Sequence, residues 1–518
     1  MFKESKISQR LRKLERHLKQ ENPILSEVVQ NFRELDQISR RVGFFHREES
    51  HATSTPWWPL ISILGIYSAG KSTFINHFLQ YNLQATGIQA VDDKFSVICF
   101  TRDNKERVLP GLALDADPRF PLYKVSRAIE EVAVGQGEHI DAYLQLKTCP
   151  SESLRGKILI DSPGFDADDQ RTSTLRITDH IIELSDLVLV FFDARHPETG
   201  SMRDTLQHLV KATVNRRDSN KFLYILNQID VTANEDNLEE VYAAWQRALA
   251  QYGLTAGSSY AIYNQDAAIP FKDEDVRARF ESKREADSNA IYNRIEQVGV
   301  ERAYRIVGML EQTSRMMKQD VVPVLLRFID KWRRKILWLE GVIVGALVVT
   351  FMVLTIWGGY WEGLSLKLPF WDLVAQNNYI KYGAIGILLI SVGYAHFSIR
   401  RWSANKIIHK LLQEVKNPEL HPNCRRAFRK SSRWWRSLFL PNPAGWSKST
   451  AARLEKVLED SNAYIQKLND EYTNPSGEDK IATEYGRQAS GGSPQSDLTR
   501  DESAAARGHH TGSFASDN

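Results

Sequence analysis

The stretch Ile61–Thr73, ISILGIYSAGKST, decides how this sequence folds. Its apolar start, ISIL, is typical of a buried strand, and the residues after it, FINHFL, carry apolar side chains at helical spacing. Between the two lies the spacing G-x-x-x-x-G-K-[ST], which runs from Gly65 through Gly70 and Lys71 to Ser72. A strand, a glycine-rich turn and a helix in this order predict a phosphate-binding loop.

Each residue type in this loop has a physical reason. Glycines let the backbone curl so that successive N–H groups point at phosphate oxygens, and the helix adds the positive end of its dipole. Lys71 is expected to reach the β- and γ-phosphates, and the Ser72 hydroxyl to bind Mg²⁺. The residues expected to bind nucleotide here are Gly65, Tyr67, Ser68, Ala69, Gly70, Lys71, Ser72 and Thr73.

Apolar strands alternate with amphipathic stretches up to about residue 263, as a mostly parallel sheet covered by helices requires. After the strand before the loop, the next four candidates are residues 95–101, 157–160, 187–192 and 221–226. Asp161-Ser162-Pro163-Gly164 follows the second of these four. A D-x-x-G at a strand end predicts that Asp161 holds the Mg²⁺ shell through water and that the Gly164 N–H meets the γ-phosphate.

The last of these strands is followed by a base-selecting signature. Asn227, Gln228 and Asp230 lie in an N-x-x-D pattern that is similar to the guanine motif N-K-x-D, with Gln228 in place of the lysine whose stem covers the base. There the carboxylate accepts two hydrogen bonds from guanine and the asparagine ties its loop to the phosphate loop. An ordinary strand-end turn is the alternative, and the three motifs in order argue against it.

Five ordered segments resemble the EHD family of dynamin-superfamily ATPases, over about Trp58 to Asp230. They are GIYSAGKSTFI (Gly65–Ile75), VLPGLALDADP (Val108–Pro118), IDSPGFDADDQR (Ile160–Arg171), FFDA (Phe191–Ala194) and LNQID (Leu226–Asp230). The resemblance implies an α/β P-loop NTPase fold of the dynamin type, which dimerises on nucleotide binding and shapes or tethers membranes. EHD proteins use ATP and most of the superfamily GTP. Asn227 and Asp230 favour GTP here, with ATP left open.

Two departures from that family change the expectations. Its first switch carries a threonine that closes over Mg²⁺ and the γ-phosphate, whereas the aligned residues here are Val91 and Asp92. Valine cannot bind a metal, and aspartate either binds it directly or repels the phosphate. Thr86 or Ser96 is the alternative ligand if the loop folds differently, and slow basal hydrolysis is expected. The calcium-binding type of domain that ends EHD proteins has no counterpart motif, and apolar segments stand in its place.

Residues 336–361 are long and apolar enough to cross a bilayer, and residues 382–399 form a shorter second run. Lysines and arginines flank the outer ends of both runs, while the loop between them, residues 362–381, has only Lys367 and Lys381. The positive-inside rule therefore predicts a two-span integral membrane protein with both termini in the cytoplasm. The charged N-terminus lacks a signal-peptide pattern, which favours a bacterial inner membrane.

The net charge, the cysteine spacing and the distribution of basic residues indicate the character of the remaining segments. The net charge is +3 and the three cysteines follow no metal-ligand spacing. Residues 400–448 hold twelve Lys/Arg against two Glu, interleaved with aromatics, which favours an anionic lipid surface over nucleic acid. The segments expected are helices over 1–55, the G domain over 56–290, a helical stalk over 291–335, the spans and their loop at 336–361, 362–381 and 382–399, a basic helical region over 400–472 and a disordered tail over 473–518.

These observations predict a membrane-anchored dynamin-like GTPase that acts as a homo-dimer or higher oligomer. Lys71, Ser72, Asp161 and Gly164 are its expected catalytic residues, and Ser72 and Asp161 its Mg²⁺ residues. The alternative is a nucleotide-dependent switch or scaffold that recruits partners without remodelling the membrane. A nucleotide-gated transporter is disfavoured, because Glu340 and His396 are the only acidic or basic residues within the two spans.

Overall fold

The computed structural model describes residues 6–86, 94–103, 105–116, 119, 140–164, 171–195, 219–251, 253–254, 257–366, 378–415 and 418–473. The chain divides into a compact unit, Met1–Leu468, and a C-terminal unit, Asn469–Asn518. The tail that the sequence predicts to be disordered lies outside the described residues, apart from Thr473, which ends a helix.

An eight-stranded sheet forms the centre of the nucleotide domain, in the order β3-β4-β2-β5-β1-β6-β7-β8. Its strands are β1 (Leu60–Gly65), β2 (Phe95–Phe100), β3 (Arg107–Pro110), β4 (Leu144–Cys149), β5 (Ile158–Asp161), β6 (Leu187–Asp193), β7 (Phe222–Asn227) and β8 (Ser258–Ala261). The pairings β2/β5 and β3/β4 are antiparallel, and the others are parallel. The mostly parallel sheet predicted from the sequence is therefore confirmed, with three further strands, β3, β4 and β8.

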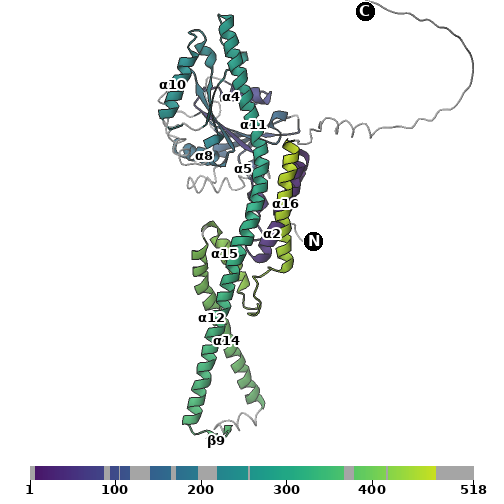
Figure 1. Cartoon of the computed structure of the whole chain (residues 1–518), viewed down its shortest axis with the longest axis vertical. Helices are drawn as coiled ribbons and strands as arrows, with labels where there is room; N and C mark the ends of the chain where they lie inside the picture. Colours follow the sequence, from purple (N-terminus) through teal and green to yellow (C-terminus); the bar gives the residue numbers. More distant parts are fainter. Residues whose placement is uncertain are drawn as a thin grey trace, which may run out of the picture. The chain divides into compact units, whose positions relative to one another are not determined.

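Helices cover both faces of this sheet (Figure 1). The helices of this domain are α4 (Lys71–Leu79), α5 (Leu112–Ala116), α7 (Ile140–Tyr143), α8 (Arg171–Leu184) and α10 (Leu238–Gln251), with 3₁₀ turns at Glu152–Leu154, Ser219–Lys221, Ile229–Thr232 and Gln265–Ala267. The pleat of β5 separates two cores: Leu159 packs in the core beneath α4 and α10, while Ile158 and Ile160 pack in the core that includes α8 and the N-terminal helices.

The remaining helices form the stalk and the apolar region. They are α1 (Lys6–Glu21), α2 (Pro23–Val42), α3 (His51–Ser54), α11 (Glu274–Met316), α12 (Val322–Trp357), α14 (Asn378–Glu414), α15 (His421–Ser431) and α16 (Lys448–Thr473), with a 3₁₀ turn at Pro418–Leu420 and a two-stranded ribbon of β9 (Trp361–Glu362) and β10 (Ser365–Leu366). Asn22 separates α1 from α2 as its position before Pro23 predicts: its side chain accepts a hydrogen bond from the Leu25 N–H at 3.1 Å and caps α2.

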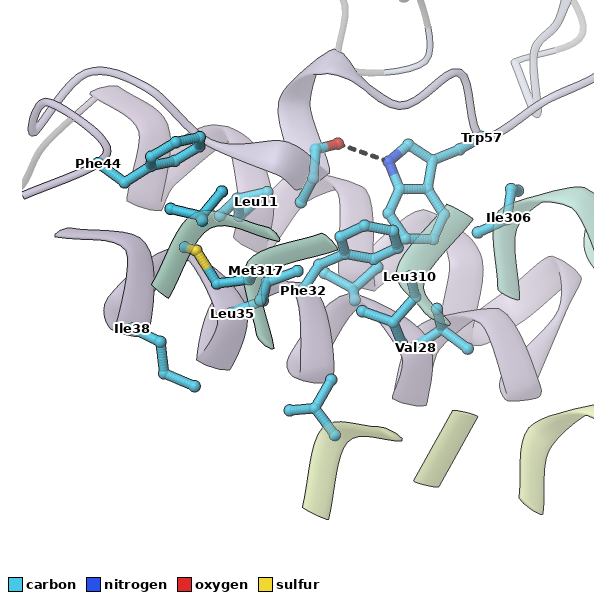
Figure 2. Close-up of a cluster of buried hydrophobic side chains, with 14 of the residues drawn as sticks. Leu11, Val28, Phe32, Leu35, Ile38, Phe44, Trp57, Ile306, Leu310 and Met317 are labelled. Carbon is cyan, nitrogen blue, oxygen red and sulfur yellow. Dashed lines mark hydrogen bonds between the residues drawn. The ribbon is translucent and has the colours of Figure 1, made fainter. Parts of the chain in front are cut away.

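A hydrophobic core joins α2 to α11 (Figure 2). Val28, Phe32 and Leu35 from α2 are buried with Ile306 and Leu310 from α11. Trp57 closes this core by packing edge-on against Phe32, with ring centroids 5.6 Å apart, while its indole N–H donates to the Ala52 carbonyl at 2.7 Å. The N-terminal helices therefore pack against the helix that follows the nucleotide domain.

Helix α11 is anchored to the sheet through buried polar contacts. Arg302 donates from Nη1 to Asp186 Oδ1 at 3.0 Å and from Nε to the Pro56 carbonyl at 2.8 Å. The other oxygen of Asp186 accepts from the Leu60 N–H, at the start of β1, at 3.0 Å. Near the other end of the helix, Asp287 Oδ2 accepts from the Ala261 N–H at 2.6 Å. These contacts attach α11 to both the centre and the edge of the sheet.

A π-helical turn at Met317–Val321 connects α11 to α12. Pro323 lies in the first turn of α12, where the missing N–H costs least. A proline ring also clashes with the carbonyl of an ordinary preceding helical turn, and the wider π turn relieves that clash. Helix α12 therefore starts beside Pro323, directly after the π turn, without a break in the chain's helical course.

Helices α12 and α14 are each long and apolar enough, by length and composition, to cross a membrane. They cross and then diverge toward β9 (Figure 1), and their apolar side chains are mostly exposed: Val349 is 62% and Ile390 73% exposed. Within these helices Glu340 Oε1 lies 2.6 Å from His396 Nδ1, so the two polar side chains satisfy one another. The apolar surface has no protein partner within the described residues.

Candidate nucleotide-binding site

Strand register brings the three sequence motifs to one edge of the sheet. Ile63 in β1 pairs with Asp161 in β5. Two residues further along β1, Gly65 pairs with Phe191 in β6. Asn227 then pairs with the end of β6. Because these strands are parallel, their carboxyl ends meet at the same edge, which is where α/β folds bind ligands.

The phosphate loop holds Lys71 in place by its own backbone. The Lys71 ammonium donates to the carbonyls of Gly65 and Ile66, at 3.0 Å each. Burial lowers the pKa of Lys71, and the nearby Asp161 carboxylate partly opposes this shift. Neutral carbonyls are weaker partners for an ammonium than phosphate oxygens are, so an arriving phosphate can take over this donor. Ser72 and Thr73 are partly exposed in the first turn of α4.

A buried polar network surrounds Asp161. Gln84 Nε2 donates to Asp161 Oδ2 at 2.5 Å, and Lys147 Nζ donates to Gln84 Oε1 at 2.6 Å. All three side chains are buried. The glutamine amide thus connects a cation on β4 to the carboxylate on β5, and fixes the direction in which that carboxylate faces.

Gly164 lies directly against the phosphate loop. A Cβ on Gly164 would come within 3.1 Å of the Tyr67 Cα and of its ring, which is closer than ordinary packing. The absence of a side chain at Gly164 therefore lets the D-x-x-G segment approach Tyr67. This places the two predicted γ-phosphate elements side by side. The segment from Phe165 to Gln170, which continues the motif, lies outside the described residues.

The base-selecting segment is tied to the phosphate loop. The Asn227 amide donates to the Ala69 carbonyl at 2.9 Å, and the Gln228 amide donates to the Ser68 carbonyl at 2.7 Å. Gly70 has a φ of +84°, and a Cβ there would lie 2.1 Å from Asn227 Nδ2. The loop requires glycine at this position for both its backbone conformation and its close approach to Asn227.

A backbone hydrogen bond fixes the orientation of the Asp230 carboxylate. Its Oδ2 accepts from the Ile269 N–H at 3.0 Å. Burial raises the pKa of Asp230, while the Ile269 hydrogen bond and the Arg195 guanidinium lower it. Arg195 itself forms a bidentate pair with the buried Asp193: its Nε donates to Oδ1 at 3.0 Å and its Nη2 to Oδ2 at 2.6 Å.

A pocket of about 240 Å³ adjoins the loop. Its walls include Thr73 at the start of α4, Asn227 at the end of β7, and Tyr263 in the segment after β8. Arg284 closes one side: it lies over the Tyr263 ring, 5.5 Å from the centroid, and donates to Gln265 at 2.7 Å. The segment after β8 is thus part of the same site as the predicted motifs.

The residues present fit a Mg²⁺ ion. A serine hydroxyl at residue 72 and a carboxylate at Asp161 are hard oxygen donors, and Mg²⁺ commonly keeps several waters alongside one or two protein ligands and the substrate phosphates. No cluster of three or more acidic, histidine or cysteine side chains suited to a metal occurs among the described residues. The first-switch residues Val91 and Asp92 lie outside the part of the chain that the structure describes.

Sequence reasoning missed three side chains at this site: Gln84, Lys147 and Arg195. Gln84 belongs to a connecting segment with no motif around it, and Arg195 directly follows the FFDA segment, for which no role at the site was predicted. Lys147 did carry a signal, since a lysine within the apolar strand LQLKTC requires a buried partner for its charge. The other expected residues lie where the motifs placed them along the loop, β5 and β7.

Comparison with known proteins bears on the domain that carries these motifs. A sequence profile described as the Dynamin family matches residues 61–229. EH domain-containing protein 1 of Bos taurus is 26% identical over 268 residues, which cover 50% of this chain and 46% of the relative. EH domain-containing protein 3 of Homo sapiens is 25% identical over the same coverage. The chain therefore spans about half the length of these relatives.

One solved structure aligns along most of the chain. It is described as "An oligomerised bacterial dynamin pair provides a mechanism for the long-range sensing and tethering of membranes", and it is 13% identical, covering 93% of this chain and 77% of that chain with a TM-score of 0.29. The profile match, the curated relatives and the site geometry agree on one conclusion. The chain carries a G domain of the dynamin superfamily that is similar to that of the EHD proteins.

Proposed function

We propose that this chain is a membrane-anchored dynamin-like GTPase that couples nucleotide-dependent pairing of its G domains to membrane tethering or remodelling. The observation that carries the proposal is a physical connection. Helix α11 is bonded to the sheet that holds the nucleotide site, and it continues through the π turn into α12, whose apolar surface has no protein partner within the described residues. Lipid is the partner that such a surface fits.

Within the site, Lys71, Gly164 and the loop amides bind the β- and γ-phosphates. Ser72 and Asp161 hold Mg²⁺, which when bound neutralises charge on those phosphates. Gln84 and Lys147 keep the Asp161 carboxylate in a fixed direction. Asp230 and Asn227 select guanine, and Gln228 holds the loop rather than covering the base as a lysine would. This last feature leaves ATP as a second possible nucleotide.

The test is nucleotide hydrolysis by the full-length protein in liposomes, with GTP and ATP measured side by side. The proposal predicts turnover of GTP that rises with protein density on the membrane and disappears in Lys71→Ala. Liposome aggregation or tubulation under the same conditions should depend on the nucleotide. Turnover that is independent of protein density would contradict pairing of the G domains.

A switch that recruits a partner without remodelling is the second candidate, and Val91 and Asp92 favour it. These residues replace the threonine that closes over the metal in the family that the sequence resembles. Tight GTP binding without measurable turnover, together with no effect on liposome shape, would select the switch over the remodelling enzyme.

A further inference from the structure

A large basic cavity lies in the helical part of the chain, away from the nucleotide motifs. It has a volume of about 1010 Å³ and opens between the C-terminal end of α2, the segment after it, α14 and α15. This exceeds the usual range of small-ligand pockets, roughly 300–1,000 Å³. The positively charged side chains that line it are Arg40, Arg47, Arg425, Arg426, Arg429, Lys430 and Arg433, and no acidic residue is among its described lining residues.

Some of these cations already have structural partners. Arg426 donates to Glu49 Oε2 at 2.7 Å and to the Phe44 carbonyl at 3.0 Å. Lys430 donates to the carbonyls of Arg40 and Arg41 at 2.9 and 2.8 Å, at the C-terminal end of α2. Helix α15 is thereby attached to the end of α2, so the cavity is a built feature with two fixed walls.

Three other arginines have no such partner. The side chains of Arg47, Arg425 and Arg429 are exposed and form no hydrogen bond or ion pair within the part of the chain that the structure describes. Arg425 and Arg429 are four residues apart on α15, so their charges face the same side of the helix and repel one another. Arg47, in the segment after α2, also lines the cavity.

On the α15 side the sequence supplies no acid to offset these charges, whereas Glu48 and Glu49 follow Arg47 on the other side and Glu49 pairs with Arg426. No Asp or Glu occurs between Leu420 and Leu454, a stretch that contains all the basic residues of α15. Like charges at this density destabilise the helix unless an anion screens them. Guanidinium groups suit phosphate in particular, because their planar donors match two phosphate oxygens at once.

We propose that this cavity is a binding site for an anion that carries several phosphate charges, held by Arg425 and Arg429 on α15 and by Arg47 in the segment after α2. The site goes beyond the function proposed above, since it contains no residue of the nucleotide motifs. A bound anion bridges α15 to the segment after α2, and so clamps the N-terminal helices to the base of the stalk.

Two sources of such phosphates are compatible with the position of the cavity. Arg400, which directly follows the second apolar run, donates to the carbonyls of Arg433 and Arg436 at 3.0 and 2.7 Å. The part of the cavity lined by Arg433 therefore lies next to the end of that run. The neighbouring Trp434 and Trp435 are 62% and 61% exposed. If the run spans a bilayer, as proposed above, its phosphate headgroups lie near this end of the cavity, where attraction to the arginines is screened least. A soluble polyphosphate compound is the other source.

The experiment measures tripolyphosphate binding to full-length protein by calorimetry, in detergent and in nanodiscs. The nanodiscs contain phosphatidylcholine alone or with phosphatidic acid, and hydrogen exchange of residues 43–47 and 421–431 is followed in parallel. All variants carry Lys71→Ala, because the phosphate loop would otherwise also bind tripolyphosphate. We compare this background with and without Arg425→Ser/Arg429→Ser. Both arginines are exposed and unpartnered within the described residues, so this variant should fold normally. The control, Arg401→Ser/Lys410→Ser, removes the same charge from exposed positions on α14.

The proposal predicts saturable binding that weakens about tenfold or more in the α15 variant and less than about threefold in the control. Slower exchange at both cavity walls should accompany it. Tripolyphosphate binding in detergent points to a soluble ligand, whereas protection seen only with phosphatidic acid points to a headgroup. Equal losses in both variants would show diffuse attraction, and no binding in either medium would show that the cavity is not a phosphate site; each result overturns the proposal.

Discussion

Asp36 is buried and accepts a hydrogen bond from the backbone of His51, and burial shifts the pKa values of these two side chains in opposite directions. Asp36 Oδ1 accepts from the His51 N–H at 2.7 Å, and the Ser50 hydroxyl donates to Oδ2. Burial raises the pKa of Asp36 to about 6, although these hydrogen bonds and Arg40 lower it. Burial lowers the pKa of His51 to about 4, and Arg40 adds to that effect. The pair lies beside the core that joins α2 to α11.

The direction in which each residue changes stability with pH depends on whether the folded or the unfolded chain binds the proton more tightly. Between pH 3.8 and about 6, folded Asp36 holds a proton that the unfolded chain has released. Its contribution to folding stability is therefore full below this window and is lost as the pH rises through it. Between about pH 4 and 6.5, folded His51 is neutral while the unfolded chain is protonated, so its contribution is full above the window and is lost as the pH falls.

The two effects have similar size. At about 1.4 kcal/mol per pH unit, the displacement of Asp36 from 3.8 to about 6 amounts to ~3 kcal/mol. That of His51, from 6.5 to about 4, amounts to ~2–3 kcal/mol after allowance for its partial exposure. The wild-type pair therefore changes the stability of this region by less than ~1 kcal/mol between pH 4 and 6.5.

Single substitutions should separate the two titrations. Relative to wild type, Asp36→Asn should gain ~3 kcal/mol in local stability from pH 4 to 7. His51→Phe, which keeps the ring contact with Phe45, should lose ~2–3 kcal/mol over the same range. Hydrogen exchange of residues 23–42 in detergent, corrected for the intrinsic rate at each pH, measures this local opening. Difference curves that are flat, or that slope in the same direction for both variants, would refute the reasoning.

Three further outcomes follow from contacts described above. Gly70→Ala should weaken nucleotide binding roughly 100-fold in a fluorescent-nucleotide titration, because of its +84° φ and the 2.1 Å approach of its Cβ to a side-chain amide. Arg302→Met should destabilise the chain by ~3–5 kcal/mol in thermal unfolding, since it leaves a buried carboxylate with one fewer partner, whereas Arg305→Met, at an exposed guanidinium on the same carboxylate, should cost under ~1 kcal/mol. Glu340→Gln and His396→Gln should each destabilise the apolar helix pair, with a coupling of ~0.6–2 kcal/mol in a double-mutant cycle.

The spacing of the sequence motifs predicted the strands that carry the nucleotide site better than it predicted the strands at the two edges of the sheet. The loop from Gly65 to Ser72 and the strand ends at Asp161 and Asn227 carry glycines and polar residues in fixed order, and parallel register brings them together. Strand β3, by contrast, is exposed along its whole length and ends in proline, so it has no apolar alternation to reveal it. Strand β8, SSYA, is equally weak as a pattern. Both are edge strands, which pack against fewer neighbours.

The start of α11 was also beyond what periodicity can indicate. The sequence predicts renewed helix from about residue 290, whereas the helix begins at Glu274. Its first turns are highly charged and solvated, so they show no apolar repeat. Capping fixes the start instead: the Asp273 side chain accepts from the Asp275 N–H at 2.9 Å. Buried polar partners such as Gln84 and Lys147 were missed for a related reason, because their pairing joins residues far apart in the chain.

The attachment of α11 bears on how nucleotide chemistry reaches the apolar helices. Arg302 and Asp287 bond this helix to the start of β1 and to β8, and the buried Arg302–Asp186 pair is costly to separate because it would leave charge without a partner. Movement of these strands therefore favours displacement of the whole helix over local melting. The π turn at Met317–Val321 is the point along this path with the least regular hydrogen bonding. A change in helix direction is thus expected at that turn, between the stalk core and the first apolar segment.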